Sequence, residues 1–180
     1  GMGMAPLIGG ISADTEWRAA FWGTVFISIL LSIFPPDGKP RQISSTPSFK
    51  NLLQRKVTLI GFATFIVATG PMGINVLVAV VARDEFNVSG SNAGLILMGG
   101  AFSNFILSPI WGGKIAVSYT HQSSVIAAVS LAVFSGLIVF STGPITLGIF
   151  WALAGGAVGC MSVALQALGA TAIPDNRGGG

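Results

Sequence analysis

The sequence predicts an all-α membrane protein, a polytopic helical bundle, and three observations support this fold class. Hydrophobic residues make up 52% of the 180 residues and charged residues only 8%, whereas an ordinary soluble domain is roughly 25% charged. Long apolar stretches recur, each close to the roughly 20 residues that a helix needs to cross a bilayer. Basic residues are concentrated in alternate connectors between these stretches. So few charges cannot form a water-facing surface, and we expect the lipid bilayer to surround the chain.

The overall composition also excludes several classes of protein. The net charge is +3, but scattered basic residues do not form the dense basic face of a nucleic-acid-binding protein. The single cysteine, Cys160, excludes an intrachain disulfide and a cysteine-built metal site, and we expect no metal and no cofactor. The chain starts with Gly1 and lacks the basic region of a signal peptide. We therefore interpret it as a piece of a longer protein.

Five transmembrane helices are predicted from the apolar stretches, in the order 19–34, 57–82, 92–117, 122–141 and 145–173. The first is short, but Trp17 and Trp22 can anchor it at a membrane interface. The last two form one uncharged run that is too long for a single span, so it must break. Thr142, Gly143 and Pro144 predict a tight turn there. Residues 1–11 are interpreted as the last turns of a sixth helix.

The connectors predict the orientation in the membrane. If the spans alternate, one set of connectors (35–56, 113–121 and 174–180) holds seven Lys and Arg residues, and the other set holds only Arg18 and Arg83. The positive-inside rule places the first set in the cytoplasm. The long connector is rich in Pro, Ser and basic residues and predicts a flexible linker. The chain thus divides into 1–34, the linker 35–56, and 57–180.

The order of short motifs resembles that of the major facilitator superfamily. Gly1-x-x-x-Ala5-Pro6-x-x-Gly9-Gly10 is similar to the antiporter signature on the fifth helix of its drug:proton antiporters, with Ala5 in place of a glycine. Trp17, Arg18 and Phe21 resemble the start of helix six, the run 108–114 resembles the end of helix eight, and 173–178 resembles the loop before helix eleven. The resemblance implies a partial major facilitator fold, from the end of helix five to helix ten, with the other helices missing.

Polar residues within the spans are candidates for the substrate pathway, because polar groups are costly in a bilayer. Asn75 follows Gly70, Pro71 and Gly73, which should loosen its helix, although Asn75 could instead bond a freed backbone carbonyl. Asn104 and Gln166 are candidates for substrate contact or for bonding between helices. Trp151 could stack on substrate, although an interfacial anchor is the stronger interpretation.

Small residues predict a helix contact. Gly1, Ala5 and Gly9 recur every four positions and form a ridge on one helix face, which lets two membrane helices approach closely. Pro6 and Gly10 complete the same motif. By depth, the ridge matches Gly99 and Ser103, which are also four residues apart. We expect these two sets to pack together and to seal the external side of the pathway.

The resemblance implies a secondary transporter in the plasma (cell inner) membrane that works by alternating access and exports small hydrophobic molecules or drugs in exchange for protons. No acidic residue lies within a predicted span, so the proton carrier is expected in the missing helices. The alternatives are an importer or facilitator of sugars or organic anions, and a non-transporting membrane scaffold or sensor. The spans lack the nucleophile–base pair, acidic pair or metal ligands that an enzyme would need, so no enzymatic activity is expected.

Overall fold

The computed structural model describes residues 5–16, 18–33 and 54–172, and every regular element in these ranges is a helix. The elements are α1 (Ala5–Asp14), α2 (Arg18–Ile33), α4 (Arg55–Asp84), α5 (Gly90–Ile110), the π-helix η1 (Trp111–Ile115), α6 (Ala116–Ser118), α7 (Thr120–Leu137), the 3-10 helix η2 (Ile138–Phe140) and α8 (Pro144–Ala172). The all-helical prediction is confirmed. Most of the predicted linker 35–56 lies outside the described residues, but its last two residues already belong to α4.

Four segments are long and apolar enough to cross a membrane: Arg55–Asp84, Gly90–Gly113, Thr120–Phe140 and Pro144–Ala172. They agree with four of the five predicted spans. The fifth corresponds to α2, whose apolar part, Phe21–Leu30, is a shorter helix. At 1.5 Å per residue, α2 is about 24 Å long, which is less than the roughly 30 Å of a hydrocarbon core.

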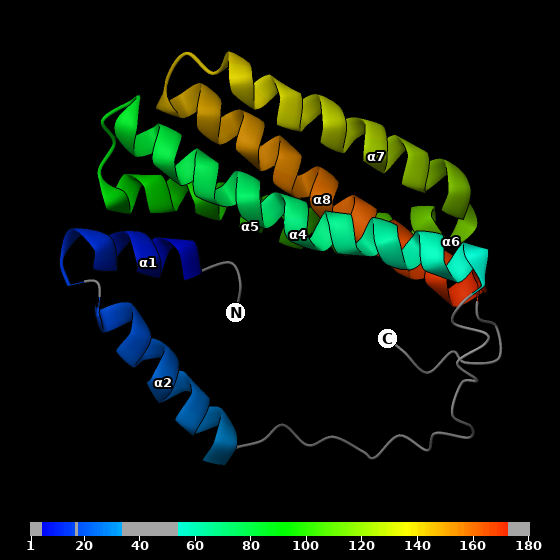
Figure 1. Ribbon diagram of the computed structural model, residues 1–180, viewed down its shortest axis with the longest axis horizontal. Helices are drawn as coiled ribbons and strands as arrows, with labels where there is room; N and C mark the ends of the chain where they lie inside the picture. The colour runs from blue at the N-terminus through cyan, green and yellow to red at the C-terminus, as the bar shows by residue number, and fades with distance from the viewer. Residues whose placement is uncertain (1–4, 17, 34–53, 173–180) are drawn as a thin grey trace.

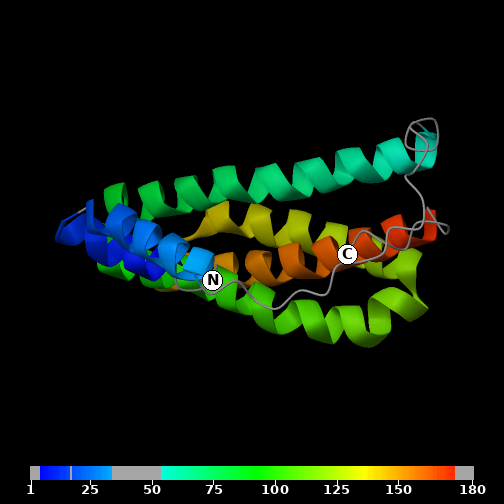
Figure 2. The same cartoon turned by 90° about the horizontal axis from the view of Figure 1, so that it is seen from below.

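The long helices lie side by side and alternate in direction (Figure 1). Helix α8 is central, because it packs against α5, α7 and α4. Half of its most apolar segment is buried in the bundle, against 17% for α5 and α7 and 11% for α4. Helix α1 packs against α5 at the end of the bundle where α4 ends and α5 begins, and α2 leads away from it (Figures 1 and 2).

Close backbone contact holds α5 to α8. A Cβ atom at Gly155 of α8 would overlap the backbone of Gly100 in α5, and a Cβ at Gly100 would overlap the Trp151 ring. Small side chains therefore take the place that larger ones hold in soluble cores, as is typical where helices associate by packing and without a drive from water. The result is the most extensive helix pair of the structure.

The predicted turn at Thr142–Pro144 is confirmed. Helix η2 ends at Phe140 and α8 begins at Pro144, where proline is favoured because the first helical N–H has no partner within the helix. The Thr146 hydroxyl oxygen accepts hydrogen bonds from the backbone N–H groups of Thr142 (3.1 Å) and Gly143 (3.2 Å). This local capping fixes the reversal between α7 and α8.

The predicted loop 113–121 is wrong. The chain stays helical through η1 and α6 as far as Ser118, and only Tyr119, with φ −131° and ψ 51°, separates it from α7. Pro109 lies two residues before the π-helix and removes one backbone donor from α5. A Cβ at Gly112 would lie 2.7 Å from a Val163 methyl group. Glycine at this position allows the π-helix to pack on α8. The sequence alone suggested that the glycine belonged to a loop.

Candidate functional site

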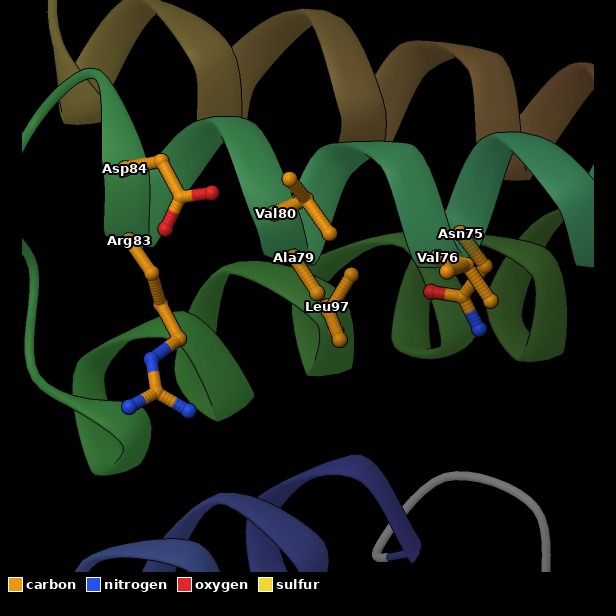
Figure 3. A pocket seen from close by; sticks show the side chains of 7 residues that line it. All are labelled: Asn75, Val76, Ala79, Val80, Arg83, Asp84 and Leu97. Carbon is orange, nitrogen blue, oxygen red and sulfur yellow. The ribbon is translucent and has the colours of Figure 1, made fainter.

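An open cleft of about 450 Å³ runs along the C-terminal half of α4. Six residues of α4 and one of α5 line it: Asn75, Val76, Ala79, Val80, Arg83, Asp84 and Leu97 (Figure 3). The α4 residues fall into two rows with a spacing of four, which is the spacing of neighbours on one helix face. The arrangement therefore follows from the sequence of α4 once its rotation is fixed by packing on α5 and α8.

Asn75 supplies the polar group at the inner end of the cleft. Its carboxamide oxygen Oδ1 is buried and has no hydrogen-bond partner among the described residues. The alternative was that Asn75 donates to a backbone carbonyl freed by Pro71. No such hydrogen bond is present among the described residues. Buried polar groups are normally paired, so an unpaired acceptor here is available to a donor group of a bound molecule.

Arg83 and Asp84 stand at the outer end of the cleft, eight and nine residues after Asn75. In Figure 3 the Arg83 guanidinium extends away from α4 on the side where α1 lies. At 1.5 Å per residue, it starts about 12 Å further out along the helix than Asn75. The cleft thus has an apolar middle, an amide at one end and charged side chains at the other.

Gly70, Pro71 and Gly73 do not interrupt α4, which runs unbroken from Arg55 to Asp84. The sequence predicted a loosened helix at this point, but the helix shows no break there. Proline still removes one backbone donor, and added Cβ atoms at both glycines would meet nothing within 4 Å. The use of this segment as a hinge stays a prediction.

Trp151 is neither an interfacial anchor nor a residue of the cleft. Its side chain is 6% exposed, and its Nε1–H donates to the Leu97 carbonyl oxygen at 3.3 Å. The missing side chain at Gly100 makes room for the indole. Trp151 therefore ties α8 to α5 in the core of the bundle.

Asn104 and Gln166 also lie away from the cleft. The Asn104 Oδ1 accepts a hydrogen bond from the Ser108 hydroxyl at 2.9 Å, and a Cβ at Gly159 of α8 would lie 2.7 Å from the same oxygen. Asn104 thus packs between α5 and α8. Gln166 is exposed on α8. Of the four polar candidates, the structure places only Asn75 on the cleft.

The predicted ridge on α1 has the right partner helix but the wrong face. A Cβ at Gly9 would meet nothing within 4 Å and Ala5 is exposed, while Gly1 lies outside the described residues. Gly99 and Ser103 instead face α8: a Cβ at Gly99 would meet the Ala152 Cβ at 3.9 Å, and one at Gly156 would meet the Ser103 hydroxyl at 2.8 Å.

The face of α1 that does contact α5 carries Pro6, Gly10 and Asp14, which are again spaced by four. A Cβ at Gly10 would overlap the Gly90 carbonyl, and a Cβ at Gly94 would lie 2.6 Å from the Pro6 carbonyl oxygen. The two backbones therefore touch directly. The depth of the contact is close to the predicted one, because α1 and α5 run in opposite directions from the same end.

Asp14 is a functional candidate that the sequence reasoning missed. Its carboxylate accepts hydrogen bonds from the first turn of α5, at Gly90 and Ser91. These bonds, led by the one from the Ser91 hydroxyl, lower the pKa of Asp14 below its usual value, and the positive charge of Arg83 contributes. The sequence offered one signal: Asp14 lies four residues after Gly10 and therefore on the same face of the helix.

A metal or cofactor site finds no support in the described part of the chain. Among those residues, His, Cys, Asp and Glu side chains form no group of three that could hold a metal ion.

Comparison with known proteins identifies the family. The profile of the Major Facilitator Superfamily matches residues 1–180, the whole chain. No curated protein and no solved structure matches the chain significantly.

Proposed function

Because the chain belongs to the major facilitator superfamily, we propose that it works as a proton-coupled exporter of small hydrophobic molecules or drugs. Members of the superfamily are transport proteins and not enzymes, and the chain is a multi-pass integral membrane protein of the kind typically found in the cell membrane. The family thus accounts for the lipid environment and for a small-molecule substrate. Export and proton coupling are the parts that we propose.

The cleft beside Asn75 is the observation that carries the proposal. Its volume of about 450 Å³ lies within the roughly 300–1,000 Å³ of small-molecule sites, which are mostly apolar with a few polar groups. Four of its seven lining side chains are aliphatic: Val76, Ala79, Val80 and Leu97. A largely apolar molecule with one hydrogen-bond donor would match this lining.

The contact between α1 and α5 supports alternating access. It joins the helix pair α1–α2 to the four-helix bundle at one end only, where α1 and α5 meet (Figure 1). By the distribution of basic residues, that end is external. The arrangement thus corresponds to a state closed to the outside. The antiporter-like pattern at residues 1–10, with Gly10 at the contact, favours export.

An importer of organic anions is the second candidate, and Arg83 favours it. A guanidinium at the mouth of a cleft attracts and pairs with carboxylates. Under the export proposal, in contrast, Arg83 has no required role in binding a neutral or cationic substrate. Replacing Arg83 therefore separates the two candidates.

Dye accumulation in cells that express the protein tests the proposal. We expect expression to lower the cellular content of a hydrophobic dye, a protonophore to abolish this effect, and Asn75→Ala to weaken it. Asn92→Ala, an exposed amide outside the cleft, is the matched control. Arg83→Gln should lower export less than Asn75→Ala does. Dye export that persists unchanged with the protonophore would refute proton coupling, and loss of organic-anion uptake in Arg83→Gln would favour the importer.

A further inference from the structure

We propose that Asp14 is a positioning residue for transport: it latches the external ends of α1 and α5 together, and it must let go before the external side can open. The proposal rests on the alternating-access function proposed above. It concerns the contact between the two helix groups and not the cleft, so it does not depend on the identity of the substrate or the coupling ion.

The latch consists of three hydrogen bonds to one carboxylate. The Gly90 backbone N–H donates to Asp14 Oδ1 at 2.8 Å, and the Ser91 backbone N–H and hydroxyl donate to Oδ2 at 2.6 and 2.7 Å. All three donors belong to α5, and the acceptor is the last residue of α1. Both carboxylate oxygens are thus engaged across the contact.

These bonds complete the start of α5. The first N–H groups of a helix have no acceptor within it. The Ser89 hydroxyl accepts from the Asn92 N–H (3.3 Å) and the Ser89 carbonyl accepts from the Ala93 N–H (2.9 Å). The Asp14 carboxylate accepts from the two N–H groups that precede these, at Gly90 and Ser91. Because the N-terminus of a helix carries partial positive charge, a carboxylate is favoured there. Asp14 is therefore a cap supplied by another helix.

Backbone contact brings the carboxylate within reach. Gly10 and Gly94 leave no side chain between α1 and α5, and a Cβ at Gly90 would lie only 2.5 Å from Asp14 Oδ1. A separation of the two helices by more than about 1 Å would stretch hydrogen bonds of this length beyond their usual range. Release of the latch and opening of this contact are therefore coupled.

Asp14 stays ionised at physiological pH, because its pKa is lowered. The hydrogen bonds from Ser91 lower its pKa, and Arg83 of α4 adds a favourable charge interaction. The neighbouring charges Glu16 and Arg18 pair with each other at 3.8 Å. Protonation therefore does not release the latch in the physiological range, and we infer that helix movement does.

The experiment measures external access to the cleft. A reporter cysteine at Leu97, in a background with Cys160→Ala, is labelled from outside with an impermeant thiol reagent in cells. We expect Asp14→Asn to raise the labelling rate about fivefold, because both carboxylate oxygens accept hydrogen bonds from α5, whereas the amide nitrogen of Asn cannot accept one and the negative charge at the helix N-terminus is lost. Ser91→Ala should raise it less, because the two backbone bonds remain. Glu16→Gln is the matched control and should leave the rate unchanged.

An unchanged labelling rate in Asp14→Asn, or an equal rise in Glu16→Gln, would overturn the latch. If Asp14→Asn does not reach the membrane, Ser91→Ala carries the test alone, and no increase there would also count against the proposal. Proton-independent dye transport, in contrast, would refute the export mechanism and leave the labelling result intact.

Discussion

Because α1 and α5 touch through their backbones, adding a single methyl group at Gly94 should force the two helices apart. Gly94→Ala places a Cβ 2.6 Å from the Pro6 carbonyl oxygen, 3.2 Å from the Leu7 Cα and 3.3 Å from the Gly10 Cα, where ordinary contact begins at 3.4 Å. All three atoms are backbone, so no side chain can rotate away. The helices must separate by most of an ångström.

The size of the effect follows from the cost of overpacking, which is about 1–3 kcal/mol for a well-packed contact. If this cost falls on the closed state alone, the equilibrium shifts toward the external-open state by roughly 5- to 150-fold. The bundle itself should stay folded, because α5 packs on α8 through its other face. Gly94→Ala therefore acts on gating more than on stability.

Labelling of Leu97→Cys from outside is the assay, and Gly99→Ala on the same helix is the control. A Cβ at Gly99 would meet only the Ala152 Cβ, at an ordinary 3.9 Å. We expect a clear rise in labelling for Gly94→Ala and none for Gly99→Ala. Equal rates in the two variants would refute the close contact at Gly94. A rise in Gly99→Ala alone would support the sequence-based prediction that the face of α5 with Gly99 packs against α1.

Four further predictions follow from the same structure. Trp151→Phe removes the hydrogen bond to α5 and should lower stability in detergent by about 1 kcal/mol, measured by thermal unfolding. Gly73→Leu should impair transport more than it lowers folded protein in the membrane if α4 bends there; equal losses would indicate a purely structural role. Cysteines at Ser45 and Glu85 should be labelled from opposite sides of the membrane, and labelling of both by one impermeant reagent in cells would contradict the orientation. The Asp14 pKa is lowered, so its bonds stabilise the contact above the ordinary carboxylate range and are lost only as the pH falls through the lowered value. The external labelling rate of Leu97→Cys, divided by that of the exposed reference Glu85→Cys so that the change in thiolate fraction cancels, should therefore stay flat from about pH 8 to 5.

Hydropathy and turn chemistry were sufficient to predict the helices. The four long spans follow from apolar length, which is decisive because a backbone in lipid must satisfy its own hydrogen bonds. The turn before Pro144 follows from the local chemistry of glycine and proline. The segment after Ile110 misled for the same reason: Gly112, Gly113 and Lys114 are typical of a loop, but the chain stays helical through them, and at Gly112 it packs closely against Val163 of α8.

Helix rotation could not be predicted from the same information. At the start of the chain the series Gly1, Ala5, Gly9 and the series Pro6, Gly10, Asp14 have identical spacing, and small residues alone favour the first. The second prevails in the structure because Asp14 meets the free N–H groups of α5, a long-range partner that no local pattern reveals. Trp151 shows the same limit: its depth suggested an interface, whereas its orientation depends on the space above Gly100.

Alternating access needs one helix contact that persists and another that releases, and the structure provides both on opposite faces of α5. Toward α8, Trp151 and Gly155 interlock with Gly100 and a buried hydrogen bond joins the helices, so separation would open a cavity in the core. Toward α1, the contact is backbone on backbone and ends in an exposed carboxylate whose bonds water can replace. Separation there opens a contact between backbones with no large side chain between them and leaves Gly90 and Ser91 solvated. We therefore expect helix α5 to move with α8 as one body, and the Asp14 end of α1 to be where the external side opens.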